Sequence, residues 1–255
     1  MDIVFIGGGR LATQFAQALR RQGHSISAVY SRTLAHAEVL ARLLGALATD
    51  SVDGLPRQAD AFILAVKDAA IAELLPQLCK GREGQAFFHT SGSVPMSVFG
   101  GHENCGVIYP MQTFSKERRV DFSNVPIFIE GSNERACQLA ADIALTVSSH
   151  VESRNSEERR ILHLAAVFAC NFANHCYALS AKVLEQAGMS FDVMLPLIDE
   201  TAAKVHDMPP RDAQTGPAVR YDEGVIEAHL KLLQDDPVTY DVYKCLSQSI
   251  YSHNR

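Results

Sequence analysis

Long apolar runs and a basic excess are both missing from this sequence of 255 residues. No apolar run approaches the ~18 residues of a membrane-spanning helix, so we expect no membrane partner. Lys and Arg total 23 against 29 Asp and Glu, a formal net charge of −6 at pH 7. A broad nucleic-acid surface requires a basic excess, so we expect no nucleic-acid partner either.

Paired cysteines are missing too. None of the six cysteines belongs to a C-x-x-C pair, so we expect no disulfide framework and no metal site. Free thiols suit a reducing compartment. The chain enters an apolar strand at once, without a basic leader or a cleavage site, so we expect no signal peptide and a cytoplasmic protein. The cysteines are Cys79, Cys105, Cys137, Cys170, Cys176 and Cys245.

The beginning of the chain combines a strand, a glycine turn and a helix. The run Ile3-Val4-Phe5-Ile6 is followed by a G-x-G-x-x-A pattern and then by helical spacing, which together predict a dinucleotide-binding loop. Gly7 makes the tight turn, Gly9 lets the backbone approach a pyrophosphate, and Ala12 lets the helix lie close to the strand. The N–H groups at the helix start face the phosphates. The alternative is a glycine turn that serves close packing alone. The candidate cofactor residues are Gly7, Gly9, Arg10, Leu11 and Ala12.

The residues after the next predicted strand, 26–30, indicate which cofactor binds. An NAD-binding unit usually carries Asp or Glu there to bind the ribose 2′-hydroxyl, and this chain has neither. Ser31, Arg32 and Thr33 offer hydroxyl and guanidinium donors, which suit a 2′-phosphate. The alternative is that Thr33 only caps the next helix and Arg32 is solvated, although both readings can hold at once. We therefore predict NADP(H).

Strands and helices alternate up to about residue 150. The continuous apolar run 61–66 is typical of a parallel strand buried on both faces. The alternation predicts an α/β fold with a doubly wound, mostly parallel sheet. Ligands of such sheets bind beyond the carboxyl ends of the strands. Val66 and Lys67, residues 89–93 and residues 109–112 are therefore site candidates, although Lys67 could equally be solvated.

The pattern changes near residue 150. Ser156, with Arg159 where Glu is usual, predicts an imperfect helix cap. No Pro or Gly occurs from 157 to 187, which predicts one helix about 45 Å long, too long for a small sheet domain. We expect a dinucleotide-binding domain at 1–150 and an all-α domain at 151–255.

A polar stripe runs along the apolar middle of this long helix. Asn171, His175 and Lys182 fall on one face, with Asn174 beside it and His163 at its edge. A buried amide costs about 1–3 kcal/mol unless it is hydrogen-bonded. The stripe therefore either faces the cofactor cleft or bonds within a helical dimer core. His163 and His175 are about 18 Å apart along the axis and cannot both touch one small substrate, whereas Asn171 and His175 can.

His89 is the other candidate acid. It follows a sheet strand, and histidine titrates near neutrality, as a general acid should. Ser91 nearby could orient a substrate. The alternative is a polar loop that only turns the chain. Tyr109 is either a packing residue or an acid, and packing is favoured.

These segments together carry a family resemblance. They resemble a bacterial family of NADP oxidoreductases, in which a Rossmann domain precedes a helical domain of unknown function. The layout is more distantly similar to pyrroline-5-carboxylate reductase, deazaflavin-dependent NADP reductase and the β-hydroxyacid dehydrogenases. The resemblance implies a helical domain like that of 6-phosphogluconate dehydrogenase, and a homodimer formed through it; it supplies no substrate. The matching segments are residues 7–12, 29–33, 89–93, 109–114, 163–168, 171–172 and 215–220.

One departure bears on the chemistry. The β-hydroxyacid dehydrogenases carry K-x-x-x-N on the long helix, whereas here Val167 precedes Asn171 by four positions and Cys170 precedes Asn174. Imine reduction demands less of the protein, because a protonated imine already accepts hydride. We therefore predict NADP(H)-dependent hydride transfer to or from a small carbonyl or imine, with His89 or His175 handling the proton and Ser91 and Asn171 orienting the substrate. The rival hypothesis is a non-catalytic NADP(H)-sensing or scaffold protein.

Overall fold

The structure, a computed structural model, describes residues 1–254 and divides into two compact units. The first comprises Met1–Asn171, and the second begins at Phe172. The predicted domain boundary lies at residue 150, but strand β8 (Val151–Ser153) still pairs with the sheet of the first unit. The chain leaves the first unit inside a helical run, where no change of composition marks the division.

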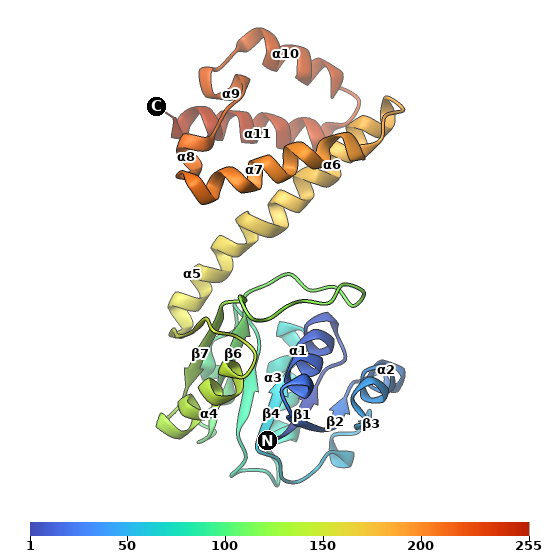
Figure 1. The fold of residues 1–255 in the computed structure, drawn as a ribbon, viewed down its shortest axis with the longest axis vertical. Coiled ribbons are helices and arrows are strands. Elements are labelled where there is room, and N and C mark those ends of the chain that lie inside the picture. Colours follow the sequence, from blue (N-terminus) through green and yellow to red (C-terminus); the bar gives the residue numbers. More distant parts are fainter. Residues whose placement is uncertain (255) are drawn as a thin grey trace. The chain divides into compact units, whose positions relative to one another are not determined.

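One eight-stranded sheet forms the centre of the first unit, with the order β3-β2-β1-β4-β5-β6-β7-β8 (Figure 1). Neighbouring strands are parallel except β6 and β7, which are antiparallel. The predicted doubly wound, mostly parallel sheet is therefore confirmed. The other strands are β1 (Asp2–Ile6), β2 (Ser25–Tyr30), β3 (Leu47–Thr49), β4 (Ala61–Leu64), β5 (Phe87–His89), β6 (Cys105–Pro110) and β7 (Ile127–Gly131).

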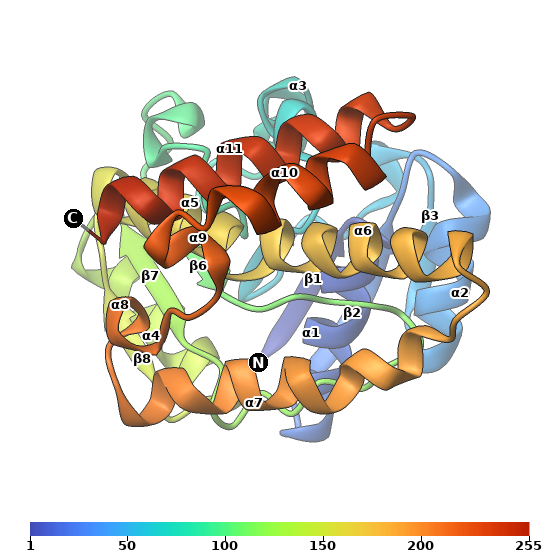
Figure 2. The same cartoon turned by 90° about the horizontal axis from the view of Figure 1, so that it is seen from above.

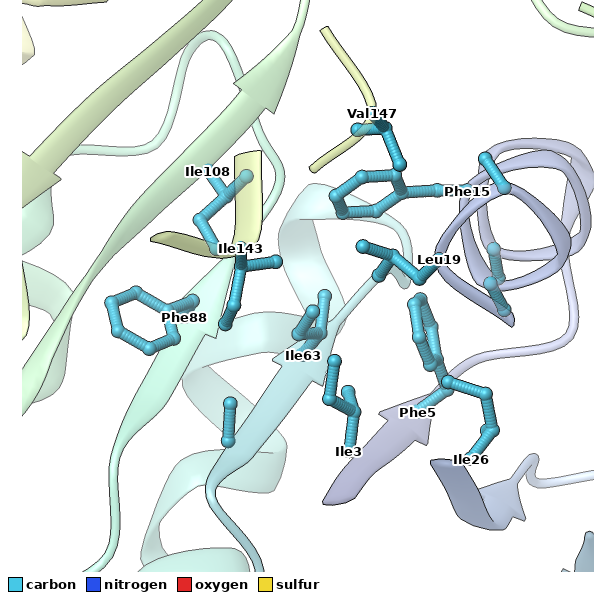
Figure 3. Packing of buried hydrophobic residues seen from close by; sticks show 14 of the residues in the cluster. Ile3, Phe5, Phe15, Leu19, Ile26, Ile63, Phe88, Ile108, Ile143 and Val147 are labelled. Carbon is cyan, nitrogen blue, oxygen red and sulfur yellow. The ribbon is translucent and has the colours of Figure 1, made fainter. Parts of the chain in front are cut away.

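Helices cover both faces of the sheet. Side chains alternate along each strand, so neighbouring residues of one strand belong to the cores on opposite faces. Ile3 and Phe5 of β1 pack in a core with α1 (Arg10–Arg21), α2 (Leu34–Leu44) and α4 (Glu134–Leu145), part of which Figure 3 shows. Val4 and Ile6 belong to the opposite core, with α3 (Asp68–Cys79) and the 3₁₀ turn η2 (Met96–Phe99). A further 3₁₀ turn, η1 (Val52–Gly54), follows β3.

The long helix predicted at 157–187 consists of α5 (Ser156–Ala166), a π-helical segment η3 (Val167–Phe172) and α6 (Ala173–Gln186). Its cap is Asn155, whose side chain accepts hydrogen bonds from the N–H groups of Glu157 and Glu158, both at 2.9 Å. The Glu158 carboxylate accepts from the Asn155 N–H at 2.9 Å, which completes a capping box. The prediction of an imperfect cap at Ser156 is therefore wrong by one residue, and Ser156 and Arg159 are left for other contacts.

The second unit is helical throughout its described residues. In Figure 2, α10 and α11 lie side by side. No helix within residues 1–254 has the length and apolarity to cross a bilayer. After α6 come η4 (Phe191–Met194), α7 (Leu195–Asp207), α8 (Pro210–Ala213), α9 (Pro217–Arg220), α10 (Glu223–Leu232) and α11 (Pro237–His253).

Candidate active site

The glycine turn is wedged between the ends of β2 and β4. Gly7 has a φ of +125°, and its N–H donates to the Tyr30 carbonyl at 2.7 Å. A Cβ at Gly7 would lie 2.3 Å from the Ala65 carbonyl oxygen, so no other residue fits there. A Cβ at Gly9 would meet nothing within 4 Å, and this leaves the open side of the turn to a ligand.

A pocket of about 370 Å³ opens beside this turn, at the carboxyl ends of β1, β2 and β4. The structure brings seven of the predicted cofactor residues to it: Gly7, Gly9, Ser31, Arg32, Thr33, Val66 and Lys67. Arg10, Leu11 and Ala12 are not among the lining residues. Ala12 is a fully buried residue of helix α1, and its small side chain permits the close packing expected of it.

The charge of this pocket fits an anionic dinucleotide. Arg32, Lys67 and Lys116 line it, and no Asp or Glu is among its lining residues. The start of α1 also presents N–H groups that have no partner within the helix, as a pyrophosphate requires. Thr33 occupies the N-cap position of α2, but its side chain makes no cap hydrogen bond, so its hydroxyl is not used by the helix. These residues fit NADP(H).

Sequence reasoning missed His36 and Lys116 in this pocket. Lys116 comes from the loop after β6, which Gln14 of α1 holds in place. The Gln14 amide donates to the carbonyls of Ser115 at 2.8 Å and Lys116 at 3.3 Å, and its oxygen accepts from the Val120 N–H at 3.2 Å. A glutamine among apolar neighbours on a core helix was the available signal for such an anchor.

His89 lies at the end of β5 with none of its surface exposed. Its Nδ1 accepts a hydrogen bond from the Ser91 N–H at 3.2 Å, and its ring stacks on Phe99 with centroids 5.6 Å apart. Burial, reinforced by the nearby Arg159 charge, lowers the pKa of His89 to about 3. A fully buried, neutral imidazole cannot protonate a substrate at neutral pH, and this argues against the predicted role of His89 as general acid.

Ser91 shapes its own loop. Its hydroxyl oxygen accepts from the N–H groups of Ser93 at 3.1 Å and Val94 at 3.0 Å. The Ser93 hydroxyl in turn donates to the Asp68 carboxylate. Asp68 is the first residue of α3, so this hydrogen bond joins the helix to the serine loop. Ser91 therefore stabilises its own loop, and its predicted contact with a substrate stays a prediction.

A buried ion pair fastens α5 to the same loop. The guanidinium of Arg159, 1% exposed, pairs with Glu130 of β7. It also donates to the carbonyls of Ser91 at 3.2 Å and Val94 at 2.7 Å. The Ser156 hydroxyl donates to Glu130 at 2.8 Å. Arg159 thus joins α5, β7 and the loop after β5, and the sequence pattern offered no sign of it.

Tyr109 and His163 meet above this loop. The Tyr109 hydroxyl and the His163 Nδ1 are 3.2 Å apart, in hydrogen-bond contact. Gly92 provides the room: a Cβ there would lie 2.7 Å from the His163 Nδ1 and 2.8 Å from the Tyr109 Cζ. Burial raises the pKa of Tyr109, with a further increase from Asp68 and an opposing effect of Arg159. Tyr109 therefore packs, as favoured, but its hydroxyl also makes a polar contact.

The predicted stripe on the long helix is exposed in the single chain. Asn171, Asn174 and His175 are all exposed there, and their place in the cofactor cleft or in a helical dimer core stays a prediction. Lys182 pairs with Asp236 at 2.6 Å. Asn171 belongs to the first unit and His175 to the second. Asn171 lies in the π-helical segment, a distortion often found at functional sites.

Comparison with known proteins adds to this geometry. Residues 2–87 match the family profile described as "NADP oxidoreductase coenzyme F420-dependent", and residues 125–250 match "Domain of unknown function (DUF2520)". A solved protein from Bacteroides fragilis, assigned as an NADP oxidoreductase, is 50% identical over 98% of both chains, with a TM-score of 0.95. The chain belongs to this family of NADP oxidoreductases. The resemblance drawn from the sequence motifs is therefore confirmed.

More distant relatives share the fold of the oxidoreductase. An imine reductase from Myxococcus stipitatus, solved in complex with NADP⁺, is 16% identical, covers 99% of this chain and 92% of its own, and has a TM-score of 0.69. A pyrroline-5-carboxylate reductase from Coxiella burnetii is 18% identical over 99% and 96% of the two chains, with a TM-score of 0.57. A search of curated proteins gives no match.

Proposed function

We propose that this oxidoreductase uses NADP(H) to transfer hydride to or from a small imine or carbonyl compound. The observation that carries the proposal is the pocket beside the glycine turn, which has three cationic side chains and no carboxylate among its lining residues. A 2′-phosphate with about two negative charges is stabilised there, whereas the carboxylate that would select a 2′-hydroxyl is missing.

Each group around the pocket has a role in this proposal. The backbone from Gly7 to Gly9 and the first N–H groups of α1, those of Arg10 and Leu11, hold the pyrophosphate. Ser31, Arg32 and Thr33 bind the 2′-phosphate, with Lys116 as a cation from the opposite loop. Val66 and Lys67 follow β4 and direct the nicotinamide end towards the neighbouring strands.

The residues present favour an imine over an alcohol. The helical run has no lysine four positions before Asn171 or Asn174 to act as acid and base. A protonated imine carries its own activating proton, so positioning supplies most of what its reduction needs. Asn171, exposed in the π-helical segment, and His175, exposed on α6, are the proposed substrate contacts on the helical run.

Exposed apolar side chains support a homodimer. Ile161 and Leu164 of α5 are 68% and 58% exposed, and Leu197 of α7 is 62% exposed. Burying such side chains stabilises an assembly by about 25 cal/mol per Å² of apolar area. We expect sedimentation to give twice the chain mass, and Leu164→Arg to lower it towards a monomer. A wild-type chain that sediments as a monomer at micromolar concentration would contradict the dimer.

The test has two stages. Calorimetric titration should show NADPH binding at least tenfold tighter than NADH, a difference of about 1.4 kcal/mol. NADPH oxidation is then followed with cyclic imines, aldehydes, ketones and the deazaflavin coenzyme F420. Turnover of an imine or carbonyl supports the proposal. Turnover of the deazaflavin alone would show that the substrate is a deazaflavin and not an imine or carbonyl. If neither NADPH nor NADH binds, or if no compound oxidises NADPH, the proposal fails.

A further inference from the structure

The carboxyl ends of β4, β5 and β6 form one edge of the first unit. The three strands are consecutive and parallel, and Leu64, His89 and Val107 share a register. Parallel strands lie about 4.8 Å apart, so Val107 of β6 lies about 10 Å across the sheet from Leu64, the last residue of β4. Val66, two residues after Leu64, lines the cofactor pocket, and Tyr109 is two residues after Val107. Tyr109 is the next-to-last residue of β6. Tyr109 therefore lies at the same edge of the sheet as the cofactor pocket, two strands away from β4.

We infer that Tyr109 and His163 form the proton-donating pair of the reduction, with Tyr109 as the donor to substrate and His163 as its proton source. This inference rests on the proposed function. The contact that supports this inference is the hydrogen bond between the Tyr109 hydroxyl and the His163 Nδ1, which are 3.2 Å apart. It lies wholly within the first unit and therefore depends on no placement of one unit against the other.

Three features hold this contact in place. Gly92 passes so close to both side chains that a Cβ would collide with each of them. Arg159 fastens α5 to the loop carbonyls of Ser91 and Val94, and His163 follows Arg159 by four residues, on the same helix face. The Tyr109 ring packs near Phe128 at 6.4 Å between centroids.

The two residues suit different parts of the task. Tyr109 is 8% exposed, and burial, with Asp68 adding to it and Arg159 opposing it, raises the pKa of its phenol. The phenol therefore stays protonated at neutral pH and can donate. His163 is more exposed than Tyr109, so its imidazole can exchange protons with solvent. His89 is fully buried beneath the same loop, so it reaches neither a substrate nor the solvent with a proton.

The proposed reduction transfers one hydride and one proton to the substrate. When bound, NADPH supplies the hydride and is oxidised to NADP⁺. As the carbon of a carbonyl, or of an imine that is not yet protonated, accepts that hydride, the π electrons of the C=O or C=N bond move to the heteroatom. The Tyr109 O–H bond breaks and its proton forms the new N–H or O–H bond. The phenolate then takes a proton from the His163 imidazolium, which is reloaded from water.

The test compares Tyr109→Phe, His163→Gln and Gly92→Ala with the wild type, using the compound that the screen finds to oxidise NADPH. Tyr109→Phe keeps the ring that packs near Phe128 and removes only the hydroxyl. We expect kcat to fall about 10²-fold or more while the Kd for NADPH stays within twofold. His163→Gln should lower kcat less and displace the high-pH limb of its pH profile. Gly92→Ala keeps both residues and should lower kcat by parting them.

A matched control exists in the helical unit. Tyr243 and His229 make a tyrosine–histidine hydrogen bond of the same kind, at 2.9 Å. Tyr243→Phe should leave kcat and its pH profile unchanged. The inference is overturned if Tyr109→Phe retains kcat within threefold, or if the Tyr243→Phe loss equals the Tyr109→Phe loss. A wild-type protein that binds NADPH but oxidises it with no compound overturns the proposed function, and the pair with it.

Discussion

Replacing Arg159 by methionine tests whether the buried ion pair organises the first unit. Arg159 is 1% exposed and Glu130 15%, so the pair is largely removed from water. The variant would leave the Glu130 carboxylate without its cation, and the carbonyls of Ser91 and Val94 without their donor. Removing one partner of a buried pair costs about 3–5 kcal/mol. Because the Ser156 hydroxyl still donates to Glu130, we expect about 3 kcal/mol.

The assay is urea unfolding at a fixed protein concentration, with the free energy of unfolding taken from the midpoint and the slope. The matched control is Arg154→Met, which breaks an ion pair with Glu152 whose side chains are 40% and 56% exposed. That change should cost less than about 1 kcal/mol. Adding Glu130→Gln to Arg159→Met should recover stability, because it removes the unpaired charge. Equal losses for Arg159→Met and Arg154→Met would refute the reasoning.

Three further predictions concern the pocket and its surroundings. Lys116→Ala should weaken NADPH binding about tenfold and leave NADH binding unchanged in calorimetry, because one cation is lost from the 2′-phosphate site; equal losses for both cofactors would contradict its assignment. Gly7→Ala should abolish NADPH binding, since its Cβ would lie 2.3 Å from the Ala65 oxygen, whereas Gly84→Ala, where a Cβ meets nothing within 4 Å, should bind normally in the same titration. The pKa of His89 is about 3, against 6.5 for an ordinary histidine, so the unfolded chain binds a proton between these pH values that the native chain does not. The buried, neutral His89 therefore costs no stability above about pH 6.5. Below that, the free energy of unfolding falls by roughly 1.4 kcal/mol per pH unit as the pH falls towards 3. His89→Phe should flatten the pH dependence of urea unfolding by this amount, and an unchanged slope would show that His89 is not held neutral.

The local features of the dinucleotide-binding unit could be predicted from the sequence. Apolar runs such as Ile3–Ile6 alternate with helical spacing, and this pattern depends on neighbours a few residues apart. The glycine turn and the triplet Ser31–Thr33 were predicted for the same reason. Each lies at a chain position that the strand–helix order places at the carboxyl edge of a parallel sheet.

The other features of the candidate site depended on contacts between residues that are far apart in the sequence. Lys116 reaches the cofactor pocket because Gln14, 102 residues earlier, anchors its loop. Tyr109 meets His163 across 54 residues, and Arg159 meets Ser91 across 68. His89 is buried because β5 lies between β4 and β6 and because Phe99 stacks on its ring.

The sequence by itself determined the order of strands and helices, the glycine turn and the chemistry that favours NADP(H), because these are written in short-range spacing and residue type. The tertiary structure alone decided what surrounds each histidine. His89 and His163 are the same residue type near the same loop, and only packing buries one and pairs the other with Tyr109. Packing depends on the whole fold, and no local pattern encodes it.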